Sequence, residues 1–268
     1  MSAKLNHLAI ISENYALSGR FYESVFGMRT ANRSRAENAV VVSDGYLGLN
    51  INPRRPARPG RLDHFGIEVD DVEAVFDTMR RKYPKVEWLK RPSNRPFAGI
   101  TTHDSDGNVF DLSQRSMENR RDVYVEMGEV NDTHIGHFAM RAMNPDNLAE
   151  FYRDVFGFEV RNKAEGDHNH YLTDGHLTMV IMPWHITDFD GTGIYSAALD
   201  HIGFTVPSVA AFKDNVDRIA ATNPSLAPPA VDAGPEGKAR LELSKRSCPL
   251  CQHHLADVDG VLLSVAEQ

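Results

Sequence analysis

The sequence predicts an α+β protein that contains four βαβββ modules in two tandem domains, because one residue pattern recurs along the chain. The motif Phe-Tyr-x-x-Val-Phe-Gly occurs at 21–27 and again at 151–157. Such self-similarity indicates duplicated structural units, and 268 residues suffice for two ordinary domains. A histidine followed by apolar residues opens a predicted strand at four places, which are His7, His64, His137 and His201.

The spacing between matching residues locates the domains. His137 follows His7 by 130 residues, and His201 follows His64 by 137. The Asp-Gly dipeptide at 106–107 matches the one at 259–260, an offset of 153 residues. Because the offset grows, we expect insertions in loops of the second half. We predict a first domain over 1–114, a linker over 115–132 and a second domain over 133–268.

Local patterns predict each element of the first module. An alternating run at 8–11 predicts a strand. Apolar residues at helical spacing then lie between Asn14, a favourable N-cap, and Gly27, which suits a helix C-terminus. Two β-prone runs, 39–43 and 46–52, join at an Asp-Gly dipeptide that tolerates positive φ. The module is therefore a strand, a helix and a hairpin.

The second module repeats this order. We predict a strand over 65–69, a helix over 72–82 and a closing hairpin around Asp106 that leads into a strand over 109–113. The second half is expected to contain the same two modules. The polar stretch between the halves is expected to carry no more than a short strand.

Composition excludes several classes of protein. The net charge of −8 and the absence of a long basic run argue against nucleic acid as a partner. No stretch reaches the roughly 18 apolar residues of a membrane span, and the first residues lack a signal-peptide core. We expect no membrane partner and a cytoplasmic location. Cys248 and Cys251 are too few for a disulfide framework, and their CxxC spacing is half of a zinc pattern without the other half.

The strand-opening histidines, the two Phe-Tyr-x-x-Val-Phe-Gly helices and the Asp-x-Asp-Gly turns at 104–107 and 257–260 together resemble the vicinal oxygen chelate superfamily. That family includes glyoxalase I, bleomycin resistance proteins and extradiol dioxygenases. The resemblance covers nearly the whole chain and implies the glyoxalase/extradiol dioxygenase fold. In that fold, paired modules form a cupped sheet, and side chains from the first and last strands hold a divalent metal.

In the first half, the resemblance places the metal ligands at His7, His64 and Asp111. Two imidazoles and one carboxylate suit Fe(II), Mn(II) or Zn(II) and leave positions open for a bidentate substrate or oxygen. We favour Fe(II) or Mn(II), with Zn(II) as the alternative. Asn50 stands where glyoxalase-like members have a further carboxylate, which argues against a four-ligand glyoxalase site.

The second half offers His137 and His201 as alternative ligands, but Ser264 stands at the carboxylate position. The resemblance to two-domain extradiol dioxygenases implies a catalytic metal in this half, where a serine is a poor substitute for an anionic ligand. Either the working site has moved to the first half, or the protein has drifted from that chemistry.

Two further histidines are candidates for acid or base catalysis. His103 lies beside the first Asp-x-Asp-Gly turn, and His254 lies just before the second. His254 also forms a sequence cluster with His253 and the two cysteines. A zinc site made from this cluster alone would have to fold back tightly on itself, so we disfavour it.

These residues support one leading hypothesis and two alternatives. The leading hypothesis is a metal-dependent enzyme that acts on a small, vicinally oxygenated aromatic substrate, with extradiol-type ring cleavage as the reaction. An isomerase or lyase of the glyoxalase type is one alternative, although Asn50 argues against it. A metal-free protein that binds a small molecule, as resistance members of the family do, is the other. The resemblance also leaves a homodimer open.

Overall fold

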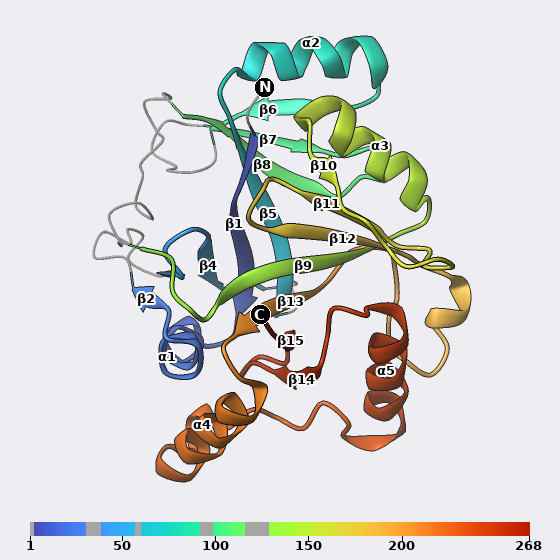
Figure 1. Ribbon diagram of the computed structural model, residues 1–268. Helices are drawn as coiled ribbons and strands as arrows, with labels where there is room; N and C mark the ends of the chain where they lie inside the picture. Colours follow the sequence, from blue (N-terminus) through green and yellow to red (C-terminus); the bar gives the residue numbers. More distant parts are fainter. Residues whose placement is uncertain (1–2, 31–38, 57–59, 92–98, 116–128) are drawn as a thin grey trace.

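The computed structural model describes residues 3–30, 39–56, 60–91, 99–115 and 129–268 (Figure 1). The strands form two sheets, one for each half of the sequence. The first sheet has the order β2-β3-β4-β1-β5-β8-β7-β6, and the second has the order β10-β11-β12-β9-β13-β15-β14.

The first three modules have the element order that the repeat predicts, and the fourth departs from it. The strands of the first sheet are β1 (Ala3–Ser12), β2 (Arg29–Thr30), β3 (Val40–Ser43), β4 (Gly48–Pro53), β5 (Arg61–Val69), β6 (Trp88–Lys90), β7 (Ile100–His103) and β8 (Val109–Gln114). The strands of the second sheet are β9 (His134–Ala142), β10 (Glu159–Val160), β11 (His170–Thr173), β12 (Thr178–Pro183), β13 (Leu199–Val206), β14 (His253–Ala256) and β15 (Leu262–Glu267). The helices are α1 (Tyr15–Phe26), α2 (Val72–Lys82), α3 (Pro145–Phe156), α4 (Val209–Thr222) and α5 (Gly234–Ser247), with short 3-10 turns η2 (Ile186–Asp188) and η3 (Pro224–Leu226).

Capping residues fix the ends of the repeated helix. The Asn14 side chain accepts a hydrogen bond from the backbone N–H of Leu17 at the start of α1. Gly27 ends this helix with φ 66°, in the left-handed region that favours glycine. Asn144 and Gly157 do the same for α3. The sequence prediction for these helices is confirmed.

The three central strands of each sheet place the histidines in equivalent positions. β1 pairs antiparallel with β5, and β5 pairs parallel with β8. In this register His7, Gly66 and Asp111 form one row across the three strands. β9, β13 and β15 repeat the arrangement with His137, Gly203 and Ser264.

The two halves share one continuous hydrophobic core. Helix α1 of the first half contacts α4 of the second, and α2 contacts α3 (Figure 1). Phe26 stacks on Phe204 across this boundary, with ring centroids 3.7 Å apart. Phe65 packs against Phe138 in the same way, at 5.2 Å. Burial of these large aromatic surfaces stabilises the association of the halves.

The repeated motifs of one half bond to those of the other. The Tyr22 hydroxyl of α1 donates a hydrogen bond to Asp257 at 2.9 Å, within the second Asp-x-Asp-Gly turn. Tyr152 of α3 donates reciprocally to Asp104 of the first such turn at 2.7 Å. These groups are buried, so each bond satisfies polar atoms that would be costly to leave unpaired.

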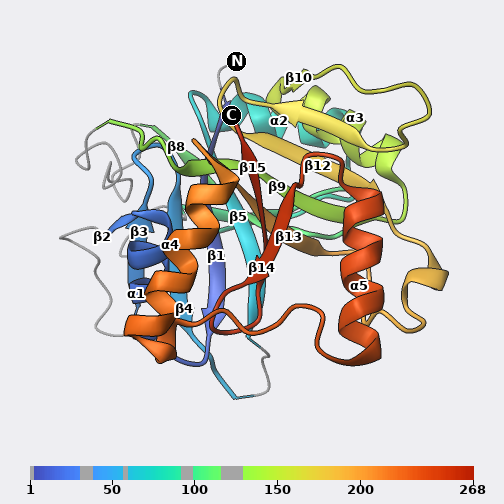
Figure 2. The same ribbon diagram turned by 60° about the horizontal axis from the view of Figure 1, so that its bottom comes forward.

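The fourth module differs from the other three in one element. Between α4 and β14 it contains helix α5, whereas the second module has strand β6 in the equivalent interval. Figure 2 shows α5 well separated from α1 and α4, on the other side of β14 and β15. The insertion that the sequence offset predicted therefore includes a helix, which ends immediately before Cys248.

Two other expectations concern membrane-spanning helices and the linker. Among the described residues, no helix is both long enough and apolar enough to cross a lipid bilayer. The short strand considered for the linker would fall mainly on residues 116–128, which lie outside the described ranges.

The buried Asp257 carboxyl predicts a pH dependence of stability. Burial raises its pKa to about 6, above its usual value near 4. The folded protein therefore keeps this proton at pH values where the unfolded chain has lost it. The free energy of unfolding should fall by roughly 3 kcal/mol, from this group alone, as the pH rises from about 4 to about 6. Denaturant unfolding at several pH values measures the slope.

The substitution Asp257→Asn should remove this component of the slope, because an amide does not titrate. Asp146→Asn is the matched control, since Asp146 has an 87% exposed side chain. Equal slopes for the wild type and Asp257→Asn between pH 4 and 6 would contradict the assignment.

Candidate metal centres

The structure brings His7, His64 and Asp111 together as one cluster, here called the first cluster. One ligand atom from each residue lies within 4.8 Å of the others. Asp111 Oδ2 is 3.4 Å from His64 Nε2 and 3.9 Å from His7 Nε2. The two imidazole rings meet edge to face, with centroids 5.6 Å apart and planes at 89°. The three donors therefore face a common point.

Strand alternation explains why these side chains share one face of the sheet. Phe65 and Phe110 belong to the hydrophobic core. Their neighbours His64 and Asp111 must then lie on the opposite face, because successive side chains of a strand alternate.

Gly66 makes room for the His7 ring. Gly66 lies between His7 and Asp111 in the row across β1, β5 and β8. A Cβ atom at this position would lie 2.2 Å from Cε1 of His7, well inside van der Waals contact. The missing side chain thus allows the imidazole to lie over β5 and extend toward Asp111.

Two hydrogen bonds orient the imidazoles. His7 Nδ1 is 2.9 Å from the side-chain oxygen of Asn6, and His64 Nδ1 is 2.9 Å from a carboxylate oxygen of Asp63. With the Nδ1 protons donated to these acceptors, each Nε2 is the nitrogen that can ligate a metal. Such outer bonds fix the tautomer of metal-binding histidines.

Asp111 is also held in place. Thr101 on β7 donates a hydrogen bond to Asp111 Oδ1 at 2.8 Å, and Arg91 donates to the Thr101 hydroxyl at 2.6 Å. The other carboxylate oxygen, Oδ2, is the one that faces both histidines.

The charges of the first cluster attract each other. Burial alone would lower the pKa of His64, but hydrogen bonds to Asp111 and Asp63 outweigh it and raise that pKa to about 9. Burial alone would raise the pKa of Asp111, whereas its bond to His64 and the nearby imidazoles hold that pKa below its usual value. The carboxylate therefore favours a cation beside the two Nε2 atoms.

The donor set fits an open transition-metal site. Two histidines and one carboxylate form the facial triad that suits Fe(II) and related ions and leaves coordination positions free. His64 has 24% of its side chain exposed, whereas His7 has 1%. Solvent or a substrate would therefore approach from the His64 side.

The structure places Asn50 near this cluster, whereas it does not bring His103 to it. Asn50 lies on β4 in the same row as Ala9 and His64, so it is near the triad but contributes no carboxylate. His103 ends β7 and uses both ring nitrogens on backbone groups: Nε2 accepts from the N–H of Glu87, and Nδ1 lies 2.9 Å from the Asp104 carbonyl oxygen. The structure does not bring His103 to the triad.

The second half has a different donor set at the equivalent place. His137 and His201 meet Cys248 and Cys251, and one ligand atom of each lies within 4.8 Å of the others. These four residues are here called the second cluster. Ser264 lies beside it, with Oγ 3.4 Å from His137 Nε2.

His254, the second acid–base candidate, also lies at this end of the sheet. His254 on β14 pairs with Ser264 on β15, just as Thr101 on β7 pairs with Asp111 on β8. Its Nε2 is buried and has no hydrogen-bond partner among the described residues. Burial and the nearby His201 lower its pKa to about 4. Its role as an acid or base remains a prediction.

The sequence alone did not link the cysteines to His137 and His201. In the sequence both cysteines lie beside His253 and His254. One signal in the sequence could have linked them. The repeat offset grows between His201 and Asp259, which indicates an insertion, and this stretch contains both cysteines. The sequence Asp-His-x-Gly occurs at 63–66 and again at 200–203. This repeat could have indicated the glycines that make room for the imidazoles and the aspartates that orient His64 and His201.

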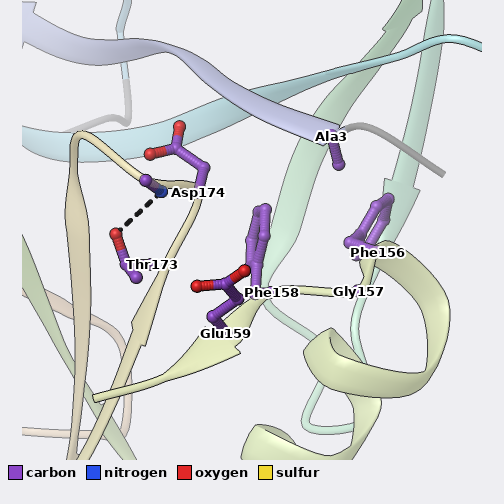
Figure 3. Close-up of a pocket in the computed structure, with 8 residues that line it drawn as sticks. Ala3, Phe156, Gly157, Phe158, Glu159, Thr173 and Asp174 are labelled. Atoms are coloured by element: carbon purple, nitrogen blue, oxygen red, sulfur yellow. Dashed lines mark hydrogen bonds between the residues drawn. The ribbon is translucent and has the colours of Figure 1, made fainter.

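A shallow pocket at the boundary of the halves is separate from both clusters. Figure 3 shows it between Ala3 at the start of β1 and the Phe156–Glu159 segment that follows α3. Asp174 at its edge already accepts a hydrogen bond from the backbone N–H of Leu5 at 2.7 Å. Asp174 therefore takes part in the contact between the halves. The lining of the pocket contains no residue of either cluster.

Comparison with known proteins agrees with this geometry. The family model of the Glyoxalase/Bleomycin resistance protein/Dioxygenase superfamily matches residues 4–112 and 134–265. The chain belongs to this superfamily. The two matched segments correspond to the two halves, and each contains one histidine pair from a cluster. No curated protein sequence matches the chain closely enough to count as a relative.

Solved structures of this superfamily share the fold at low sequence identity. The Mn(II)-bound glyoxalase from Novosphingobium aromaticivorans is 15% identical with a TM-score of 0.65, over 98% of this chain and 81% of that one. The 2,2',3-trihydroxybiphenyl 1,2-dioxygenase from a dibenzofuran-degrading Sphingomonas wittichii is 16% identical with a TM-score of 0.62, over 100% and 91%. Homoprotocatechuate 2,3-dioxygenase from Arthrobacter globiformis is 14% identical with a TM-score of 0.62, over 99% and 79%.

The glycine beside His7 gives a direct test of the first cluster. Gly66→Ala should lower Mn(II) affinity at the first cluster about tenfold or more, because the new Cβ displaces the imidazole. Equilibrium dialysis with Mn(II) measures the affinity, and thermal unfolding shows whether the variant is folded. Gly203→Ala, the equivalent change in the second half, should leave that affinity unchanged. A folded Gly66→Ala variant with wild-type Mn(II) affinity would refute the geometry.

Proposed function

We propose that the protein is a metal-dependent dioxygenase that cleaves the ring of a small aromatic substrate bearing two neighbouring hydroxyl groups, and that the first cluster holds Fe(II) or Mn(II). The observation that carries this proposal is the open His7, His64 and Asp111 triad. Three protein ligands leave the vacant positions that a bidentate substrate and oxygen require. Similar overall structures among catechol dioxygenases also support it.

The chain's own residues prepare the site for this chemistry. Asn6 and Asp63 hold the two Nε2 atoms toward the common point, and Thr101 holds Asp111. The bound ion would lower the pKa of a coordinated hydroxyl and bring the two reactants together. Ring cleavage inserts both atoms of O2 into the substrate, so the reaction needs no external reductant.

The partial exposure of His64 fits a site that admits a substrate. His7, by contrast, is almost fully buried beneath the site. The substrate would therefore enter beside His64. Asn50 favours this reaction over a glyoxalase-type isomerisation, because an amide cannot serve as the additional carboxylate base or ligand that such a reaction normally uses.

Oxygen-dependent turnover tests the proposal. Protein reconstituted anaerobically with Fe(II), and separately with Mn(II), should convert catechols to ring-opened products when O2 is admitted. Asp111→Asn should lower kcat/KM by about a hundredfold or more, because it removes the anionic ligand. Asp146→Asn makes the same chemical change at an exposed carboxylate and should retain activity. Absorbance of the ring-opened product and O2 consumption measure the rate.

Two results would contradict the proposal. Tight binding of aromatic ligands to chelator-treated protein, with no turnover in any metal-loaded form, would favour a metal-free binding protein. Turnover of a thiol adduct of an α-ketoaldehyde without oxygen would favour an isomerase or lyase instead.

A further inference from the structure

We infer that the second cluster is a closed, tetrahedral zinc site formed by His137, His201, Cys248 and Cys251. This site is separate from the catalytic site proposed above and has a structural role. Its four donors come from β9, β13 and the turn between α5 and β14.

The distances between donor atoms match the edges of a zinc tetrahedron. Zn–N bonds of about 2.05 Å and Zn–S bonds of about 2.3 Å imply tetrahedral edges of about 3.3 Å for two nitrogens and about 3.6 Å for nitrogen and sulfur. His137 Nε2 and His201 Nε2 are 3.3 Å apart. Cys251 Sγ is 3.6 Å from His201 Nε2 and 3.9 Å from His137 Nε2. Cys248 offers the fourth donor atom, which lies within 4.8 Å of the other three.

The histidines are oriented by the protein around them. His201 Nδ1 is 2.8 Å from Asp200 Oδ1, so Nε2 faces the cluster. His137 lies over Gly203, where a Cβ atom would lie 1.9 Å from its Cε1. The rings meet edge to face with planes at 90°, as in the first cluster.

A buried arginine joins the histidine side of the cluster to the cysteine side. Arg141 Nε donates to Asp200 Oδ2 at 2.7 Å, and its Nη2 donates to the Ser247 hydroxyl at 3.0 Å. Ser247 is the last residue of α5 and directly precedes Cys248. Asn169 also donates to the Ser247 carbonyl at 2.8 Å. The cysteines are thus positioned by a fixed helix end.

The donor chemistry selects zinc. Two thiolates and two imidazoles in a tetrahedron suit Zn(II), and four protein ligands leave no position for a substrate. Cys248 and His201 are fully buried, and His137 is 6% exposed. The site therefore suits a structural ion that fastens α5 to the sheet.

Cobalt(II) substitution tests the inference with a readout other than activity. Full-length protein, reduced and freed of metal, is titrated with Co(II), which gives intense sulfur-to-cobalt charge-transfer absorption only when thiolates ligate it. The wild type should show this band at one Co(II) per chain, and Zn(II) should displace it. His201→Ala and Cys251→Ser should abolish the band. His64→Ala, the matched change in the first half, should keep it.

Thiol reactivity provides a measurement that needs no variant. Zinc should protect Cys251, the partly exposed cysteine, from a thiol-reactive dye in the native protein, and a chelator should make this thiol reactive. The absence of both the band and the protection in reduced wild-type protein would overturn the inference. A band that persists in folded His201→Ala protein would overturn the assigned ligands.

Discussion

Both clusters depend on a glycine in the middle one of three neighbouring strands. This glycine pairs with a histidine on the strand to one side and with Asp111 or Ser264 on the strand to the other side. Gly66 and Gly203 occupy this place, and any side chain there would overlap His7 or His137. With the glycine present, two imidazoles meet at right angles over the sheet in each half. The strand register therefore determines where the two imidazoles of each cluster meet.

The same scaffold presents different donors because the third strand and the segment that precedes its hairpin differ between the two halves. In the first half, the third strand contributes Asp111, and Thr101 steadies it. In the second half, that strand contributes Ser264, and the insertion containing α5 supplies two cysteines instead. Three ligands leave an open site suited to catalysis, whereas four ligands close the site. Fold membership alone would not distinguish these outcomes.

The repeat in the sequence predicted the strand and helix modules and the caps of α1, because these features depend on short-range patterns that are visible in one sequence. The resemblance to the vicinal oxygen chelate superfamily named the residues of the first cluster and the histidine pair of the second. The cysteines of the second cluster were not predicted as partners of that pair, because Cys248 is far from His137 in sequence and only the three-dimensional path of α5 brings them together. His103 shows the converse problem: its position suggested chemistry, but backbone groups occupy both of its nitrogens.

We propose that the two halves hold different metals in different ligand environments. X-ray absorption spectroscopy of protein loaded with both Mn(II) and Zn(II) tests this proposal most directly, because each element is observed separately. We expect only nitrogen and oxygen neighbours around manganese, and two sulfur and two nitrogen neighbours around zinc. Sulfur around manganese, or a zinc environment without sulfur, would contradict it.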